Sequence, residues 1–212
     1  MAILQLALDF TDIKTAVSVA KKARNYVDWI EAGTPLIKSE GVSAIRELKK
    51  RFPEKKIVAD MKIMDAGALE TQLAAIAGAD VVTVLGASDL STIREAIAAG
   101  KKHRIKVMVD AMNISAARIK KIEKMSPDYI CPHVGIDQQK KGLKLVDVIA
   151  KTKIHVSLAV GGGITSKTAG LFANAGVSVI IVGAAITQAK DIRKEAKKIK
   201  TVIDSACASR QI

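Results

Sequence analysis

The chain has 212 residues, which fits one domain of ordinary size, so we expect residues 1–212 to form a single domain. Apolar residues make up 49% of the chain and charged residues 26%, which excludes a disordered, collagenous or coiled-coil protein. The two cysteines, Cys131 and Cys207, are too few for a disulfide-stapled secreted domain. The net charge of +13 favours an anionic partner, either a phosphorylated metabolite or nucleic acid.

The start of the chain lacks the features of an export signal. Met1 leads directly into the apolar run ILQLAL, without a basic region before it or a small-residue cleavage site after it. No apolar stretch approaches the roughly 20 residues that a membrane span needs. Aromatic residues make up only 3% of the chain, so the stacking residues of a single-strand nucleic-acid reader are scarce. We therefore expect a cytoplasmic protein that binds neither membranes nor nucleic acid.

Short apolar, β-branched segments alternate along the chain with longer segments of helical period. The predicted strands are residues 4–9, 29–33, 56–60, 81–85, 106–110, 129–132, 156–161 and 179–183. The predicted helices are residues 13–25, 41–51, 69–77, 90–103, 115–125, 145–150, 166–175 and 191–205. Because the strands are almost continuously hydrophobic, we expect a parallel sheet that is covered on both faces, with the helices as its crossovers.

Eight strand–helix units of about 25 residues could close into a barrel or open into a doubly wound sheet. The number of units favours an α/β fold of the (β/α)8 TIM-barrel type. A leucine-rich repeat array has a similar period, but the chain lacks its signature. A dinucleotide-binding fold does not fit, because the glycines at 161–163 follow the seventh strand and lack the GxGxxG spacing.

Polar residues end five of the predicted strands: Asp9, Glu31, Asp60, Asp110 and His133. Any one of them could be an ordinary helix cap or turn residue. In a TIM barrel, however, the carboxyl ends of all strands meet at one mouth, where active sites are built. The set therefore predicts a catalytic site at this mouth.

The densest cluster is DMKIMD, a DxKxxD motif formed by Asp60, Lys62 and Asp65. The strand period of two places Asp60 and Lys62 on the same side, facing the mouth. Neighbouring carboxylates would keep Lys62 protonated, and a fixed cation can stabilise an enolate. The alternative is a surface ion pair. Glu31 and Asp60, on neighbouring strands, are suitable oxygen ligands for Mg²⁺, with Mn²⁺ as a possible substitute.

The seventh and eighth strands end in residues suited to phosphate binding. Gly162 and Gly163 precede a predicted helix, so their backbone N–H groups and the helix dipole could bind a dianion. Gly183 and Ala184, after the eighth strand, could supply further amides. The alternative is that the glycines serve only the geometry of a tight turn.

The segments LQLALD, IEAGTP, VADMKIMD, ADVVTVLG, HVGIDQQKKG, AVGGGIT and IIVGAAIT together resemble the 3-hexulose-6-phosphate synthase family. That family belongs to the orotidine 5'-monophosphate decarboxylase suprafamily of barrels, of which DxKxxD is a specific mark. The resemblance covers nearly the whole chain. It implies a reversible aldol reaction of formaldehyde with D-ribulose 5-phosphate, which gives D-arabino-3-hexulose 6-phosphate through an enediolate.

Individual residues suit this reaction. His133, at the mouth of the sixth strand, is the candidate for shuttling the C1 proton, because imidazole can exchange a proton near neutral pH; the alternative is a histidine that only caps the loop after Pro132. Asp9 would orient Lys62 or a substrate hydroxyl. Contacts to the sugar phosphate are expected from Thr34, Asp110 and Asp137. The resemblance also implies a homodimer with shared active sites, in which Asp65 reaches into the partner's site.

Two alternatives stay open from the sequence. The related 3-keto-L-gulonate-6-phosphate decarboxylases share the Mg²⁺-enediolate chemistry, but they carry Arg where this chain has Ile136 and Glu where it has Asp110. Both differences favour the synthase. The other alternative is a non-catalytic barrel that uses its positive charge to bind nucleic acid. The physiological direction of the aldol reaction is not fixed by the sequence.

Overall fold

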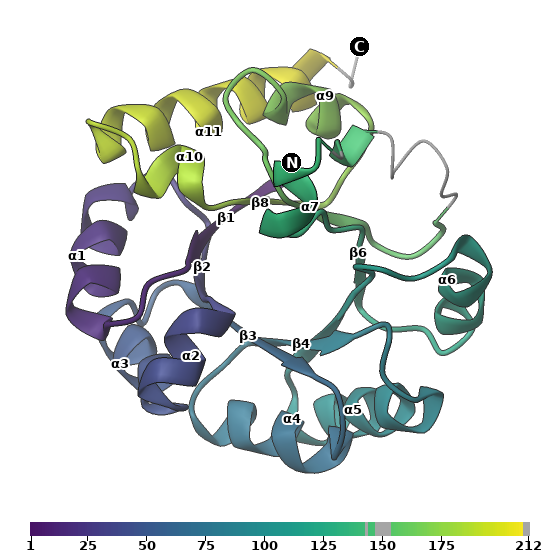
Figure 1. Ribbon diagram of the computed structural model, residues 1–212. Coiled ribbons are helices and arrows are strands. Elements are labelled where there is room, and N and C mark those ends of the chain that lie inside the picture. Colours follow the sequence, from purple (N-terminus) through teal and green to yellow (C-terminus); the bar gives the residue numbers. More distant parts are fainter. Residues whose placement is uncertain (143, 147–153, 210–212) are drawn as a thin grey trace.

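A computed structural model of the chain describes residues 1–142, 144–146 and 154–209. Its parallel strands form one sheet in the order β6-β5-β4-β3-β2-β1-β8-β7. Two isolated bridges, Ile130 to Leu158 and His133 to Gly161, join β6 to β7 and bring the sheet around to a barrel (Figure 1). The strands are β1 (Ile3–Leu8), β2 (Trp29–Ala32), β3 (Lys56–Ile63), β4 (Val81–Leu85), β5 (Lys106–Asp110), β6 (Tyr129–Cys131), β7 (Ala159–Gly161) and β8 (Val179–Val182). The predicted (β/α)8 barrel is confirmed.

Helices surround this barrel, most of them on its outer side, while the short helix Ile136–Lys140 lies over the edge of the mouth (Figure 1). They are α1 (Ile13–Ala23), α2 (Thr34–Glu40), α3 (Ser43–Arg51), α4 (Gly67–Ile76), α5 (Leu90–His103), α6 (Ala116–Glu123), α7 (Ile136–Lys140), α9 (Ala169–Asn174), α10 (Ala184–Thr187) and α11 (Ile192–Ser209). Side-chain caps fix several starts: Asp12, Asp89 and Ser115 each accept a hydrogen bond from a backbone N–H of the first turn. Within the described ranges, no helix has both the length and the apolarity of a membrane span.

Several predicted boundaries were wrong. The third strand does not stop at residue 60 but continues to Ile63, and β7 begins at Ala159 rather than at residue 156. Residues 34–40 form helix α2, which was not predicted because its short sequence TPLIKSE shows little helical period. The short helices α7 and α10 were also missed. The predicted helix 145–150 falls mostly outside the described residues.

The apolar side chains form two separate cores because each strand presents alternate residues to its two sides. The larger core lies between the strands and the helices, and it contains the fully buried Leu6 and Ile30. The smaller core fills the inside of the barrel with Trp29, Val58, Val81, Met108, Cys131, Ala159 and Val179. The rings of Trp29 and Tyr129 pack edge to face in this smaller core, with their centroids 5.8 Å apart. The inside of the barrel is therefore packed with apolar side chains, which we call the apolar floor.

The larger core, between the strands and the helices, allows a prediction about the free energy of unfolding. Leu6→Ala should lower the free energy of unfolding by about 2–5 kcal/mol, because it opens a cavity at a fully buried position. Leu171→Ala, at a site that is 58% exposed, is the matched control and should change it by less than about 0.5 kcal/mol. Urea unfolding at one protein concentration measures both. Equal losses would contradict the assignment of Leu6 to the core.

Candidate active site

A cavity of about 740 Å³ opens at the carboxyl ends of the strands. Almost all of the predicted site residues line it: Asp9, Glu31, Thr34, Asp60, Lys62, Asp110, His133, Asp137, Gly162, Gly163, Gly183 and Ala184. The exception is Asp65, which lies outside the cavity and is exposed. The side chains come from strands far apart in the sequence, so it is the closure of the barrel that assembles them.

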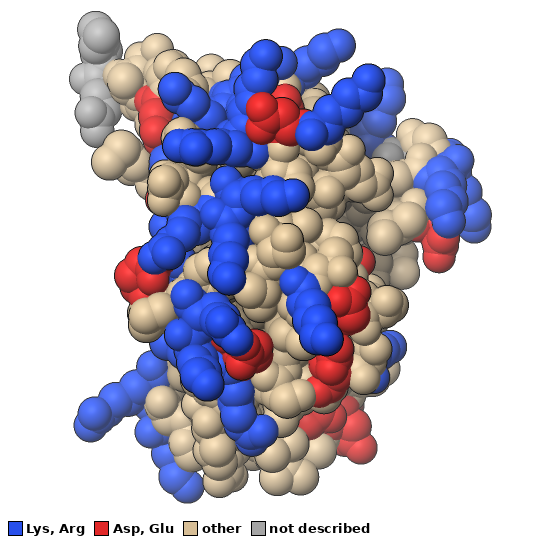
Figure 2. Space-filling model, turned by 90° about the vertical axis from the view of Figure 1, so that its left-hand side faces the viewer, with Lys and Arg blue, Asp and Glu red and all other residues tan. Residues whose placement is uncertain are grey.

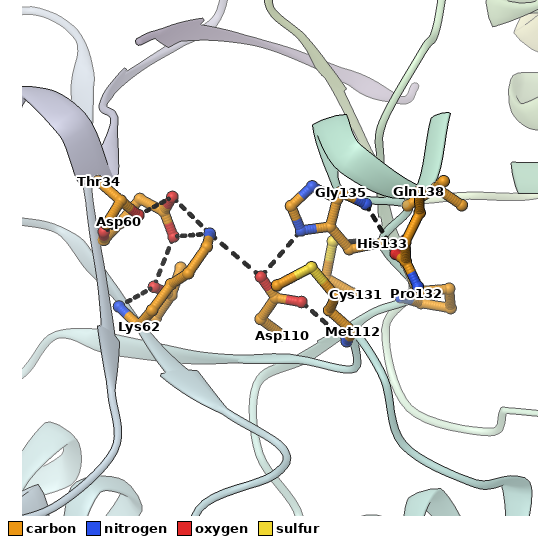
Figure 3. Close-up of polar contacts among 12 residues, drawn as sticks. Thr34, Asp60, Lys62, Asp110, Met112, Cys131, Pro132, His133, Gly135 and Gln138 are labelled. Atoms are coloured by element: carbon orange, nitrogen blue, oxygen red, sulfur yellow. Dashed lines mark hydrogen bonds and ion pairs between the residues drawn. The ribbon is translucent and has the colours of Figure 1, made fainter. Parts of the chain in front are cut away.

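Lys62 stands between two carboxylates at the centre of this cavity (Figure 3). Its Nζ lies 2.6 Å from Oδ2 of Asp60 and 3.2 Å from Oδ2 of Asp110. Burial alone would lower the pKa of Lys62, but the negative charges of Asp60 and Asp110 outweigh it and raise the pKa above its ordinary value. Lys62 is therefore a fixed ammonium group, as the DxKxxD motif predicts.

The backbone of β3 is irregular where it carries this lysine. Pairing with β4 is lost between Ala59 and Ile63, and Lys62 has a φ of 48°, which is uncommon outside glycine. Its N–H donates to Oγ1 of Thr83 on β4 at 2.9 Å instead of joining a regular ladder. A strained conformation held by its neighbours is typical of functional residues.

Asp60 is buried and bonded on several sides. Besides Lys62, the hydroxyls of Thr34 and Thr83 donate to its carboxylate at 2.7 and 2.8 Å. Thr34 is the first residue of α2 and also donates to the carbonyl oxygen of Asp60. Neighbouring elements on both sides of β3 thus fix the orientation of the Asp60 carboxylate.

Asp110 links Lys62 to His133. Its Oδ2 lies 2.9 Å from Nδ1 of His133, and its Oδ1 accepts from the N–H of Met112 at 3.0 Å (Figure 3). Burial would raise the pKa of Asp110, but His133 and Lys62 lower it below the ordinary value, so the group is a carboxylate. A carboxylate at Nδ1 makes that nitrogen the N–H donor and leaves Nε2 of His133 as the proton acceptor. The predicted substrate contact of Asp110 stays a prediction.

Glu31 and Asp9 are the two further acids of the cavity. Burial raises the pKa of Glu31 well above its ordinary value, and repulsion from Asp60 and Asp9 adds to the effect. The amide of Gln5 donates to its carboxylate. Asp9 reaches solvent at the mouth, yet the barrel wall removes much of its hydration, and this burial together with the charge of Asp60 raises its pKa.

This crowding of acids bears on the predicted metal. The described residues contain no group of three or more His, Cys, Asp or Glu arranged for a metal ion. Mg²⁺, however, needs only one or two carboxylates and completes its octahedron with water and substrate oxygens. Glu31 and Asp60 fit that demand, and a divalent cation would relieve the repulsion from Asp60 and Asp9, which adds to the effect of burial on the pKa of Glu31.

The loops after β7 and β8 form one rim of the cavity. Gly162 and Gly163 have φ values of +106° and +67°, and a Cβ on Gly162 would collide with the carbonyl oxygen of Val134, so glycine is required there. The N–H groups of these two glycines take no part in the hydrogen bonds found among the described residues. They are available to a ligand, which is consistent with the predicted phosphate site.

The cavity is also lined by polar residues that were not predicted from the sequence, among them Gln5, Thr83 and Gln139. Gln5 and Thr83 are single polar residues inside apolar strands, at positions whose period of two points into the barrel. A polar residue at such a position of the sequence indicates a side chain that lines the cavity. The amide of Gln139 donates to the carbonyl oxygen of Val134 at 2.8 Å and so braces the loop next to Gly162.

Asp137 and Ile136 lie on α7 at the rim of the cavity. Asp137 is strongly exposed and pairs with Lys140 at 3.1 Å, and its predicted substrate contact stays a prediction. Ile136 is 63% exposed and gives the mouth an apolar side chain.

A charged lysine between carboxylates, a carboxylate-bound histidine and a glycine rim, all at the mouth of a (β/α)8 barrel, define a proton-transfer enzyme for a small anionic substrate. The chain belongs to the orotidine 5'-phosphate decarboxylase / HUMPS family, whose profile matches residues 2–199. It is 40% identical over 205 residues to the 3-hexulose-6-phosphate synthase of Bacillus subtilis, covering 94% of this chain and 98% of that protein.

Solved structures agree with this placement. The crystal structure of 3-hexulose-6-phosphate synthase from Salmonella typhimurium has 42% sequence identity and a TM-score of 0.93, and the match covers 96% of this chain and 99% of that one. The 3-keto-L-gulonate-6-phosphate decarboxylase of Vibrio cholerae is more distant, at 28% identity and a TM-score of 0.82, with 96% and 98% covered. The chain is thus more similar to this synthase than to this decarboxylase.

The raised pKa of Glu31 predicts a stability effect. An acid whose pKa is higher in the folded than in the unfolded protein opposes folding at neutral pH, and the loss is regained as the pH falls through the folded pKa. Glu31→Gln should therefore raise the melting temperature at pH 7 in the absence of divalent cations, while the exposed Glu95→Gln should leave it unchanged.

Adding Mg²⁺ completes the experiment. Millimolar Mg²⁺ should stabilise the wild type and the Glu95→Gln control, because a ligand of the folded state raises its melting temperature, but not Glu31→Gln. An equal response of all proteins to Mg²⁺ would show that Glu31 holds no metal.

Proposed function

We propose that the protein is a 3-hexulose-6-phosphate synthase, which joins formaldehyde to D-ribulose 5-phosphate in a reversible aldol reaction. The observation that carries this proposal is Lys62, whose ammonium group lies 3.2 Å from the carboxylate that also holds His133. The imidazole of His133, as the base, and the ammonium group of Lys62, as the fixed cation, therefore lie in the same part of the cavity. The naming of the full-length relatives supports the same activity.

The reaction needs a proton removed from C1 of the ketose and a new bond formed at the same carbon. Nε2 of His133 takes the C1 proton, and the electron pair of the broken C–H bond forms the enediolate. The ammonium group of Lys62 stabilises the negative charge that develops on the enediolate oxygens. C1 then attacks the carbon of formaldehyde, and the oxygen of formaldehyde takes up the proton held by His133.

The remaining residues bind and orient. Mg²⁺ or Mn²⁺ on Glu31 and Asp60 would act as a Lewis acid towards the ketone and hydroxyl oxygens of the substrate. Asp110 is a positioning residue that keeps the Nδ1 proton on His133. The phosphate group is assigned to the amides of the loops after β7 and β8, and Asp9 to a substrate hydroxyl or to Lys62.

A homodimer with shared sites is part of the proposal. Helix α4 exposes an apolar stripe, formed with Met64 just before the helix: the exposed fractions are 54% for Met64, 59% for Leu69, 41% for Leu73 and 64% for Ile76. Contiguous apolar surface of this kind is typical of protein interfaces. Asp65 lies beside the stripe and outside its own cavity, so burial of the stripe against a second copy would carry Asp65 towards the partner.

The decarboxylase alternative fits the cavity less well. Its substrate carries an additional carboxylate at the reacting end, for which a second cation is useful. Lys62 is the sole Lys or Arg among the described residues that line the cavity, and α7 presents Ile136 instead. The apolar side chain of Ile136 suits neutral formaldehyde and limits the access of water that would quench the enediolate.

A product assay separates the two activities. With ribulose 5-phosphate and Mg²⁺, the protein should consume formaldehyde with a kcat/KM at least about 100-fold above that for release of CO₂ from 3-keto-L-gulonate 6-phosphate, a difference of about 2.7 kcal/mol. Lys62→Ala should abolish turnover, and its circular dichroism spectrum should match that of the wild type. Faster release of CO₂ would move the assignment to the decarboxylases.

Mixing inactive subunits tests the shared site. Lys62→Ala and Asp65→Asn subunits should each be inactive, yet a mixture should regain part of the activity, because one of the two sites in a mixed dimer has both residues intact. Exchange of subunits is verified with differently tagged chains. A mixture that stays inactive after verified exchange would place the action of Asp65 within its own chain.

A further inference from the structure

A second hollow lies on the outer surface, between the C-terminal end of α1 and the start of α11. Its volume is about 510 Å³, and it shares no lining residue with the cavity at the barrel mouth. The polar residues that line it are Lys21, Lys22, Asn25, Lys190, Asp191 and Arg193. Four cations thus surround one concave surface that the reaction at the barrel mouth does not use.

These four cations lack carboxylate partners in the part of the chain that the structure describes. Nearby surface cations behave differently: Arg24 pairs with Glu54 and Lys49 with Asp80, each at 2.8 Å. The one acid of the hollow, Asp191, is engaged elsewhere, since its Oδ1 accepts from the N–H of Lys194 at 2.9 Å in the first turn of α11. The hollow therefore keeps a net positive charge, because four cations stand against one carboxylate.

The surroundings reinforce the charge. Figure 2 looks at the side of the molecule that carries α1, and Lys and Arg side chains dominate this face. All four cations of the hollow are exposed and can be reached by a ligand. Like charges gathered around a concavity repel one another and produce a positive potential that attracts anions.

We propose that this hollow binds a small polyphosphate, that is, a ligand with two or more adjacent phosphate groups. Three ammonium groups and one guanidinium supply several charge-assisted donors at once, which suits adjacent phosphates better than a single carboxylate. The described lining contains no aromatic side chain on which a base could stack. Recognition is therefore through phosphate oxygens, and any attached organic group is not selected by stacking.

Helix α6 provides a matched control for this site. Lys21 and Lys22 occupy the last turn of α1, where cations are favourable for any helix because they complement its dipole. Lys120 and Lys121 occupy the last turn of α6 in the same way, followed by the exposed Lys124. The α6 lysines line neither of the two hollows described above, so replacing them removes equal charge without touching the proposed site.

The test is isothermal titration of the full chain with inorganic tripolyphosphate. The wild type and the control Lys120→Gln/Lys121→Gln/Lys124→Gln should bind with similar affinity, which added salt should weaken because exposed charges are screened. Lys21→Gln/Lys22→Gln/Arg193→Gln should bind at least about tenfold more weakly, since it loses three charged donors. Thermal melting confirms that both variants are folded.

Three outcomes would overturn the proposal. One is the absence of binding to the wild type, and another is an equal loss in both variants, which would indicate net charge rather than a site. The third is tighter binding of a short DNA duplex than of tripolyphosphate through the same three residues, which would make the hollow part of a nucleic-acid surface. Formaldehyde consumption by the hollow variant should equal that of the wild type, so this test stands apart from the aldolase assay.

Discussion

The ammonium group of Lys62 is the charge on which the rest of the active site depends. Asp60 and Asp110 are nearly buried, and buried carboxylates are strongly destabilising unless they are paired and hydrogen-bonded. Lys62 pairs with both, while Thr34, Thr83 and the N–H of Met112 satisfy the remaining lone pairs. Removal of the lysine would leave two buried carboxylates without the cation that they share, which favours the uptake of a proton at this part of the cavity.

This arrangement is possible because the inside of the barrel is divided into two layers. Trp29, Met108 and Cys131 belong to the apolar floor, and the polar residues stand one step further along the same strands. Met108 is followed by Asp110, and Cys131 by His133, at the period of two that keeps side chains on one face. The floor excludes water from below, so the charges above it act in a medium that screens them weakly.

Most of the active site could be predicted from the sequence, because the functional residues of a (β/α)8 barrel lie at the carboxyl ends of its strands. Polar residues at strand ends identify the mouth, and the DxKxxD spacing identifies Lys62. The sequence could not predict that β3 continues irregularly to Ile63, since loss of pairing depends on the neighbouring strand. It also could not predict that Asp110 bonds His133 and Lys62 at once, because a side chain on β5 meets those of β3 and β6 only after the barrel closes. Gln5 and Thr83 were missed for another reason: a single polar residue changes the average hydrophobicity of a strand very little.

The distribution of charge also constrains how a phosphorylated ketose can lie in the cavity. The deep part of the cavity carries Glu31, Asp60 and Asp110, and a phosphate dianion placed beside them would be repelled. In the proposed binding mode the dianion lies at the glycine loops after β7 and β8, which offer N–H groups and have no carboxylate of their own. A phosphate held there directs the other end of an extended five-carbon chain towards Lys62 and His133. Electrostatic exclusion is thus the reason why the proposed binding mode turns C1, and not the phosphate end, towards His133.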